Sequence, residues 1–426
     1  MEPTRPTRAL VPALALVLTG CAVELPTAPA DVGAPEVRVV DPAAAVGATG
    51  EVTVCGPRDT GVYTTLVESF TASRPGLSAR YVELGADTDY TRTQAIQRLE
   101  GGSAECDIYV MDVTWVGEWA SQGWVLDQSE LVAANRHGLI PTTLDTAFFD
   151  GRYWATPFHT NAGLLFYRRD RVPPPTTWRQ VYAEAAREPG NRLEMQAKPY
   201  EGLTVNFLEL LYSAGGSVLS DDGEVTVDSP QTREVLRTMT GALRDGAIDR
   251  ASLTYEEDNS RRAFESGAAG YLRQWPSAHA LIEETDVGDS VAVAPLPAFD
   301  AGAEPASVLG GWNMAIAARS TNVGGAVALI DHATGPEFQK RILLEHSQAP
   351  AISATYRDPE VLARVPFAAQ LAESVANARP RPRSPVYAQL SRAIYTNVHD
   401  AISGQSDVES AVRRMVEDLE AAQETF

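Results

Sequence analysis

The chain has 426 residues, of which 44% are hydrophobic and 21% charged, enough for one large core or two of moderate size. Its formal net charge is -21 at pH 7, and no basic run interrupts the acidic balance. Such a surface repels phosphate backbones and anionic membrane surfaces, so nucleic acid is not expected as a partner.

The first twenty residues have the order of an export signal. Arg5 and Arg8 form a small basic region, and residues 9–18 form an apolar run that is too short to span a bilayer. The run ends in Leu-Thr-Gly-Cys21, which resembles a lipobox and implies cleavage before Cys21 and lipid attachment to its thiol. Such a protein is exported and held on the outer face of the cytoplasmic membrane by its lipid alone. The alternative is ordinary secretion with an incidental cysteine.

Residues 21–50 are predicted to be the lipidated cysteine and a flexible tether, because prolines recur there among small residues without a helical or alternating pattern. Two further cysteines, Cys55 and Cys106, lie in the folded body. An even pair in an exported chain favours a disulfide. Both cysteines border predicted parallel strands, however, and neighbouring strands could hold them too far apart for a bond.

The first part of the body alternates β-rich runs with helical stretches. In chain order these are 52–55, 63–70, 79–84, 90–99 and 107–111. This alternation is typical of parallel βαβ units. Ligands of such open sheets gather beyond the carboxyl ends of the strands, and Asp59 and Asp112 both lie at such ends.

Two segments are predicted to cross between lobes. The first is 153–170, in which an aromatic pair and Pro157 lead into an apolar strand that ends in charge. The second is the apolar run 309–317, which follows a loop of glycine, proline and alanine. We therefore expect an α/β protein of two lobes, each a mostly parallel sheet flanked by helices, with hinge strands between them. The expected division is 51–158 with 306–355 for the first lobe, and 159–305 with 356–426 for the second.

Several motifs occur in order along nearly the whole body. They are Cys106 to Trp115, Glu118 to Trp124, Thr160-Asn161, Ser213 to Leu219, Gln274-Trp275-Pro276, Gly310 to Asn313 and Arg381 to Tyr387. Together they resemble the family 1 extracellular solute-binding proteins of bacterial ABC importers, and most closely the trehalose-binding lipoproteins. The resemblance implies a type II periplasmic-binding-protein-like fold without enzymatic activity. It also implies a monomer that delivers a neutral sugar, an α-linked disaccharide such as trehalose or a maltose-like sugar, to a membrane permease.

The resemblance also implies a set of ligand contacts in the cleft. They are Asp59, Asp112, Asn161, Trp275, Gly311 and Arg381, with Glu257 or its neighbour Glu256 and with Trp115 as further candidates. Carboxylates, amides and guanidinium groups suit vicinal hydroxyls, and an indole suits the flat face of a pyranose. The chain departs from the family pattern at Trp312, where the family has leucine. Trp312 would either narrow the pocket or stack on a second ring.

Each of these residues has a structural alternative. Asp59 and Asp112 could cap helices, as aspartate after a strand often does. Asn161 could satisfy backbone groups at the crossing, Trp115 could pack in the core, and Arg381 could be a solvated member of an arginine-rich run.

Two other functions remain open from the sequence. One is an exported glycoside hydrolase, which would need paired carboxylates in a cleft. The other is a sugar-sensing lipoprotein without a role in transport. The sequence contains no Gly-x-Ser-x-Gly, His-Glu-x-x-His or P-loop pattern, and its six histidines are scattered. No metal site and no cofactor are therefore expected.

Overall fold

The computed structural model describes residues 37–135, 138–220 and 222–425. The predicted export signal, Cys21 and the first part of the tether lie outside the described residues. Within the described ranges, no helix is both long and apolar enough to cross a bilayer.

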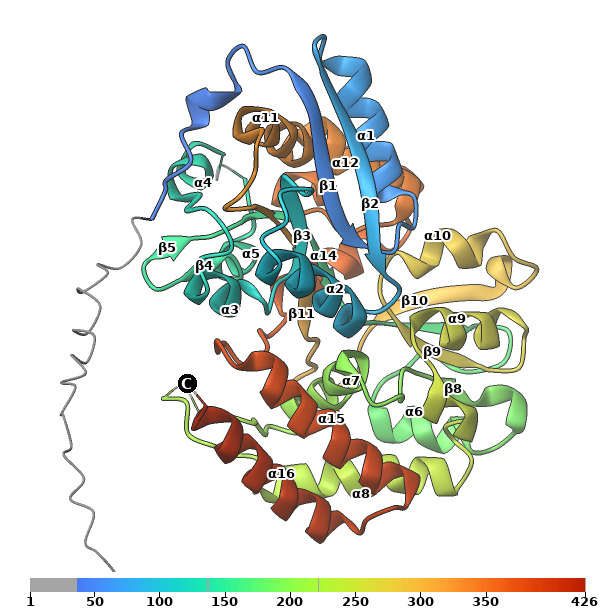
Figure 1. Cartoon of the computed structure of the whole chain (residues 1–426). Coiled ribbons are helices and arrows are strands. Elements are labelled where there is room, and N and C mark those ends of the chain that lie inside the picture. The colour runs from blue at the N-terminus through green and yellow to red at the C-terminus, as the bar shows by residue number, and fades with distance from the viewer. Residues whose placement is uncertain (1–36, 136–137, 221, 426) are drawn as a thin grey trace, which may run out of the picture. The chain divides into compact units, whose positions relative to one another are not determined.

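Two mixed β-sheets organise the body (Figure 1). The first has the order β2 (Leu77–Gly85), β1 (Gly50–Pro57), β3 (Ile108–Asp112), β11 (Leu309–Ile316) and β6 (Thr156–Ala162). The second has the order β10 (Val291–Pro295), β7 (Leu164–Arg168), β9 (Tyr271–Gln274) and β8 (Leu193–Glu194). A short hairpin joins β4 (Phe148–Phe149) and β5 (Arg152–Tyr153).

The expectation of mostly parallel sheets needs correction. In the first sheet β1 runs parallel to β2 and β3, but β11 is antiparallel to both β3 and β6. In the second sheet only the pair of β8 and β9 is parallel. The βαβ alternation predicted the first three strands correctly. The chain passes from one sheet to the other between β6 and β7 and again between β10 and β11, and the antiparallel pairs of both sheets involve these four strands.

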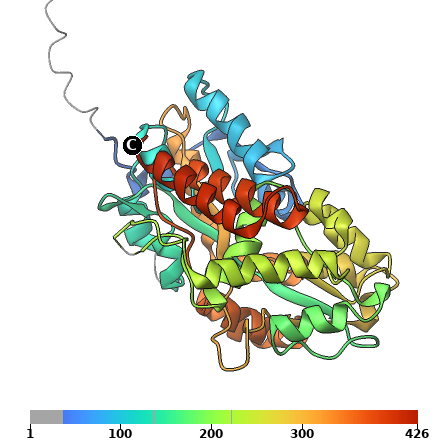
Figure 2. The ribbon, with the colours of Figure 1, turned by 90° about the horizontal axis from the view of Figure 1, so that it is seen from below.

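Helices cover both sheets, and we use the name lobe for each sheet with the helices packed around it. The first lobe holds α1 (Val62–Ser73), α2 (Thr88–Glu100), α3 (Val116–Ser121), α4 (Ser129–Asn135), α5 (Pro141–Asp145), α11 (Val323–Thr334) and α12 (Pro336–His346). The second holds α6 (Trp178–Ala185), α7 (Glu201–Ser213), α8 (Pro230–Arg244), α9 (Glu257–Glu265), α10 (Ala278–Glu283), α15 (Tyr387–Ser403) and α16 (Val408–Gln423). Two helices that were expected in the second lobe contact both: α14 (Ala368–Ala376) packs on β10 and on β6, and α13 (Pro359–Arg364) packs on α12 and α14. Figure 2 shows α15 and α16 side by side in red.

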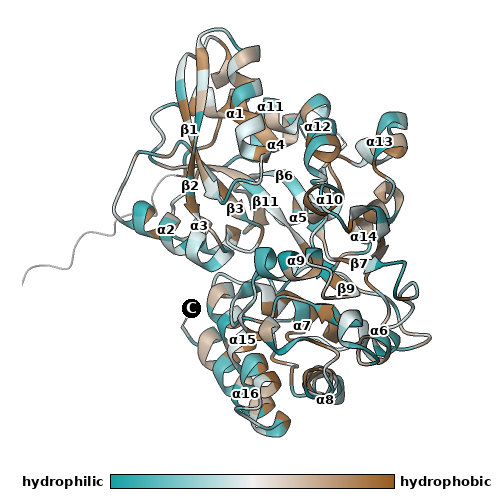
Figure 3. Cartoon of the chain, turned by 90° about the vertical axis from the view of Figure 1, so that its right-hand side faces the viewer, coloured by the Kyte–Doolittle hydropathy of each residue, from teal (hydrophilic) through white to brown (hydrophobic). Residues whose placement is uncertain are grey.

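Alternation along the strands places a core on each face of each sheet. Val54 and Cys55, neighbours on β1, belong to different buried clusters, and so do Leu165 and Phe166 on β7. Successive side chains of a strand point to opposite faces, so both faces of both sheets are covered. Figure 3 shows the hydrophobic colour along β1 and β3 and the hydrophilic colour on α2.

The body begins earlier than the sequence predicted. Val40 is 2% exposed and donates its backbone N–H to the carbonyl of Asp127 at 2.8 Å. The 3₁₀ helix η1 (Pro42–Ala45) packs against α11. The prediction that the tether extends to residue 50 is therefore wrong for its last part, whose short apolar residues pack on the first lobe.

The first crossing lies later than the expected boundary at residue 158, because β6 continues to Ala162 and β7 begins at Leu164. Gly163 alone separates the two strands, and a Cβ there would collide with the carboxylate of Glu209 and lie 2.7 Å from Nη2 of Arg273. Glycine is thus required where the chain passes this buried ion pair. The return crossing lies between Pro295 and Leu309, ahead of the run 309–317 that was expected to make it, because this run already forms β11 of the first sheet.

Cys55 and Cys106 form a disulfide, with their Cα atoms 5.8 Å apart. Cys106 lies just before β3, the strand that neighbours β1 in the first sheet. This Cα separation is within the usual range for a disulfide, so the neighbouring parallel strands do not keep the two cysteines apart.

Candidate functional site

A cavity of about 190 Å³ lies between the two lobes. It is lined by the ends of β1, β3 and β9, by β6 and β11, and by the starts of α7 and α9. Of the predicted ligand contacts, the lining includes Asp112, Asn161, Glu257, Trp275, Gly311, Trp312 and Arg381. Asp59 and Trp115 are not among the lining residues. Residues that are far apart in the chain thus meet in one small-molecule cavity.

Trp275 directly follows β9 and is held from several sides. The guanidinium of Arg273 lies 4.2 Å from the centre of the indole, and Nε1 donates to Glu257 at 3.4 Å. A Cβ added to Gly310 would lie 3.1 Å from the indole ring, so a larger residue at this position would crowd it. Arg273 is itself fixed by a buried ion pair with Glu209. The indole is therefore a fixed, half-buried platform on one wall of the cavity.

Arg381 joins the two lobes by buried ion pairs. Its Nη2 lies 3.0 Å from Asp112 at the end of β3, and its Nη1 lies 2.6 Å from Glu201 at the start of α7. At 6% exposed, Arg381 is not the solvated arginine of the alternative reading. Its Nε is buried. This one donor of the guanidinium has no hydrogen-bond partner among the described residues, in contrast to the two terminal nitrogens.

Glu201 is a site residue that the sequence analysis missed. Tyr387 donates to its carboxylate at 2.7 Å and Ser391 at 2.5 Å, besides the ion pair with Arg381. Burial raises the pKa of Glu201, and the charge of Arg381 opposes that rise. A charged residue at the start of a strongly apolar helix was the available signal, because burial of such a residue requires a partner.

Asn161 is ordered by a second missed group. Gln348 donates from Nε2 to Oδ1 of Asn161 at 2.7 Å and to Nδ1 of His159 at 2.8 Å, and all three side chains line the cavity. Burial lowers the pKa of His159 to about 3, so the ring is neutral at physiological pH. Asn161 is therefore held in place by other side chains and is not merely a cap for backbone groups at the crossing.

Both predicted glutamates line the cavity. Glu257, at the first position of α9, accepts from the hydroxyl of Tyr200 at 2.8 Å, and burial raises its pKa. Glu256 pairs with Lys198. The sequence left a choice between the two residues, and the structure brings both to the same wall.

Gly311 and Trp312 form the wall contributed by β11. Gly311 has φ of +133°, and a Cβ there would lie 2.8 Å from Cα of Thr160, so only glycine fits this position. Trp312 meets the edge of Trp115, with ring centroids 5.7 Å apart. Trp115 itself is 4% exposed and stacks on Trp119 at 5.4 Å. Trp115 thus does not line the cavity, and it supports Trp312 from the core.

Asp59, another predicted ligand contact, also lies outside the cavity lining. Its carboxylate accepts from the backbone N–H groups of Gly61 at 2.8 Å, Tyr63 at 3.0 Å and Thr64 at 2.8 Å. These are free donors at the start of α1, so Asp59 caps this helix as the alternative reading held. Among the residues that the structure describes, no group of three or more histidine, cysteine or acidic side chains could hold a metal ion.

The two lobes, the two strand crossings and a polar cavity with an indole platform define a binding protein of the periplasmic type. The chain belongs to the bacterial extracellular solute-binding proteins, whose family model matches residues 58–340. The predicted fold class is confirmed: a maltose-bound MalE3 of T. maritima superposes with a TM-score of 0.82 over 87% of this chain and 99% of that one, at 28% identity.

Two curated relatives extend the comparison. A probable ABC transporter-binding protein of Deinococcus radiodurans is 31% identical over 350 residues, which cover 78% of this chain and 81% of the relative. A mannitol-binding protein of Pseudomonas aeruginosa is 24% identical over 74% of this chain and 76% of its own length. The chain therefore belongs to a family of extracellular solute-binding proteins and not of enzymes, which removes the glycoside hydrolase alternative.

Proposed function

We propose that this protein captures a neutral sugar in the cavity between its lobes and, as a monomer, delivers it to an ABC permease. The expected ligand is an α-linked disaccharide, trehalose or a maltose-like sugar. The observation that carries this proposal is the fixed indole of Trp275 in one cavity with Asp112, Asn161 and Arg381. A pyranose offers an apolar face for the indole and hydroxyls for these polar groups.

The comparisons support the same class of ligand. The MalE3 structure contains maltose, at 28% identity to this chain, and the Pseudomonas aeruginosa relative is named for mannitol. Maltose and mannitol are both neutral and rich in hydroxyl groups. A linear polyol has no flat ring face to stack, so the indole platform favours a sugar over a polyol for this cavity.

The charge of the lining predicts which sugars fail to bind. Its acidic members are Asp87, Asp112, Glu201, Glu256, Glu257 and Asp258, and its basic members are Arg58 and Arg381. Because this lining repels anions, calorimetry is expected to detect binding of trehalose or maltose and no binding of glucose 6-phosphate. Mannitol is included in the same titrations as a polyol, and an oligopeptide is included as an unrelated ligand. Binding of the peptide alone would contradict the proposal.

We also propose that Cys21 carries a lipid that tethers the protein to the outer face of the membrane. Cys21→Ala is expected to leave the precursor unprocessed or to release the protein from the membrane, because the alanine side chain offers no thiol for the acyl chains. Fractionation of cells with an antibody to the protein measures both outcomes. Cys21→Ala protein that remains with the membrane at its mature size would show that the anchor is elsewhere.

A further inference from the structure

Two ion pairs join the lobes at the cavity, apart from the Arg381 network. In the first, Nη1 of Arg58, which follows β1 in the first lobe, lies 3.1 Å from Asp258 on α9 in the second lobe. In the second, Nζ of Lys198, which precedes α7 in the second lobe, lies 4.0 Å from Asp87 at the start of α2 in the first lobe. Arg58, Asp87 and Asp258 all line the cavity.

We infer that these two pairs form an electrostatic latch, made only when the lobes are closed, that sets how long the solute stays bound. The inference rests on the proposed function in that it concerns the same cavity. Separation of the lobes would break both pairs, because each has one partner on each lobe. The pairs thus stabilise the closed state alone, because their attraction acts between the lobes.

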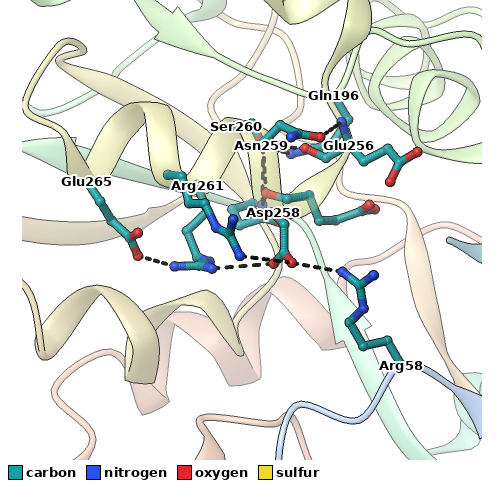
Figure 4. A network of polar contacts seen from close by, with 11 residues as sticks. Arg58, Gln196, Glu256, Asp258, Asn259, Ser260, Arg261 and Glu265 are labelled. Carbon is teal, nitrogen blue, oxygen red and sulfur yellow. Dashed lines mark hydrogen bonds and ion pairs between the residues drawn. The ribbon is translucent and has the colours of Figure 1, made fainter. Parts of the chain in front are cut away.

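The acidic partners are held in place by their own lobe. Asp258 lies in the first turn of α9, and Nη2 of Arg261 donates to it at 3.4 Å. Figure 4 shows Arg58 reaching Asp258, which Arg261 also contacts from the same helix. Asp87 accepts the backbone N–H of Tyr90 at 2.7 Å and so caps α2. Both carboxylates are therefore already positioned when the lobes meet, and little ordering is needed to form the pairs.

Each cation has a second acid on its own lobe. Arg58 lies 3.9 Å from Glu83 on β2, and Lys198 pairs with Glu256 beside α9. When the lobes separate, each cation keeps this partner and is not left unpaired. Separation of the lobes then removes only one of the two acidic partners of each cation. A modest energy difference of this kind suits a protein that must hold a solute and later release it.

The latch is expected to be modest and dependent on salt. The side chains of Arg58 and Asp258 are 47% and 40% exposed, so solvent screens their attraction. An exposed pair of this kind contributes up to about 1 kcal/mol, which changes the equilibrium between separated and closed lobes by up to about fivefold. Raising the ionic strength from about 0.01 M to about 1 M shortens the Debye length from about 30 Å to about 3 Å and should remove most of this effect.

The test measures dissociation of trehalose and of maltose by stopped-flow tryptophan fluorescence in both salts. We expect Arg58→Gln to dissociate about two- to fivefold faster than the wild type at low salt. At high salt the variant and the wild type should dissociate at similar rates. The double variant Arg58→Gln, Asp258→Asn should dissociate no faster than either single variant, because both substitutions remove the same ion pair. Arg341→Gln is the matched control, since Arg341 pairs with Glu345 within α12 at similar exposure. Equal salt dependence in wild type and Arg58→Gln would overturn the latch.

A second measurement needs no sugar and separates this inference from the proposed function. Small-angle scattering of the solute-free protein, extrapolated to zero concentration, compares wild type with the variant Arg58→Gln, Lys198→Gln. The latch predicts that high salt increases the radius of gyration of the wild type but not of the double variant. If no sugar binds, the proposed function fails, and the scattering alone decides whether the latch exists. The same radius response in both proteins would contradict it.

Discussion

Trp275→Ala is expected to weaken sugar binding by about thirtyfold or more. Truncation of a central aromatic anchor commonly costs more than about 2 kcal/mol, and about 1.4 kcal/mol corresponds to a tenfold change in affinity. The structure gives the indole this central place, because it lines the cavity and is held by Arg273 and by Glu257. Titration calorimetry with trehalose and maltose measures the loss.

Two further variants make the Trp275 result specific. Trp275→Phe keeps an aromatic face and is expected to retain part of the affinity. Trp124→Ala removes a partly exposed tryptophan that packs against Trp119 at 6.4 Å and does not line the cavity, so its affinity should match the wild type. Undiminished binding by Trp275→Ala would mean that the sugar site lies elsewhere.

Sequence patterns predicted local structure well, because local structure depends on neighbouring residues. The alternation of β-rich and helical runs predicted β1, β2 and β3 with the helices between them. The direction of β11 was missed, since its antiparallel pairing with β3 joins Trp312 to Asp112, two hundred positions apart in the chain. Strand direction in a mixed sheet depends on how the chain returns, and no local pattern records that path.

The residues of the candidate site were likewise predicted only in part. Asp112, Asn161 and Trp275 were predicted from motifs and line the cavity, whereas Asp59 has the same position after a strand and caps α1 instead. Sequence cannot separate a carboxylate that faces a cavity from one that caps a helix, because both follow strand ends. Glu201 was missed because its role depends on Arg381, which lies 180 residues later in the chain.

Arg381→Met is expected to reduce the free energy of unfolding by about 3 to 5 kcal/mol at neutral pH, because removal of one partner of a buried pair leaves uncompensated charge. Here two carboxylates, Asp112 and Glu201, would lose their shared cation. Methionine fills similar space without a charge. Denaturant unfolding of wild type and variant measures the difference, and loss of sugar binding should accompany it. Arg379→Met, an exposed arginine of the same run, is the matched control and should change the unfolding free energy little.

The pH dependence of this loss distinguishes electrostatics from packing. Burial raises the pKa of Glu201 even with Arg381 present, so without Arg381 the pKa should lie higher still. A carboxyl group whose pKa is higher in the folded than in the unfolded state lowers the stability of the fold as pH rises from the unfolded pKa to the folded pKa, and this loss is recovered as pH falls again. The stability difference between wild type and Arg381→Met should therefore shrink between about pH 7 and pH 5, since the neutral acid needs no cation. A difference that stays constant over this range would mean that Arg381 stabilises the fold by packing and not by its charge.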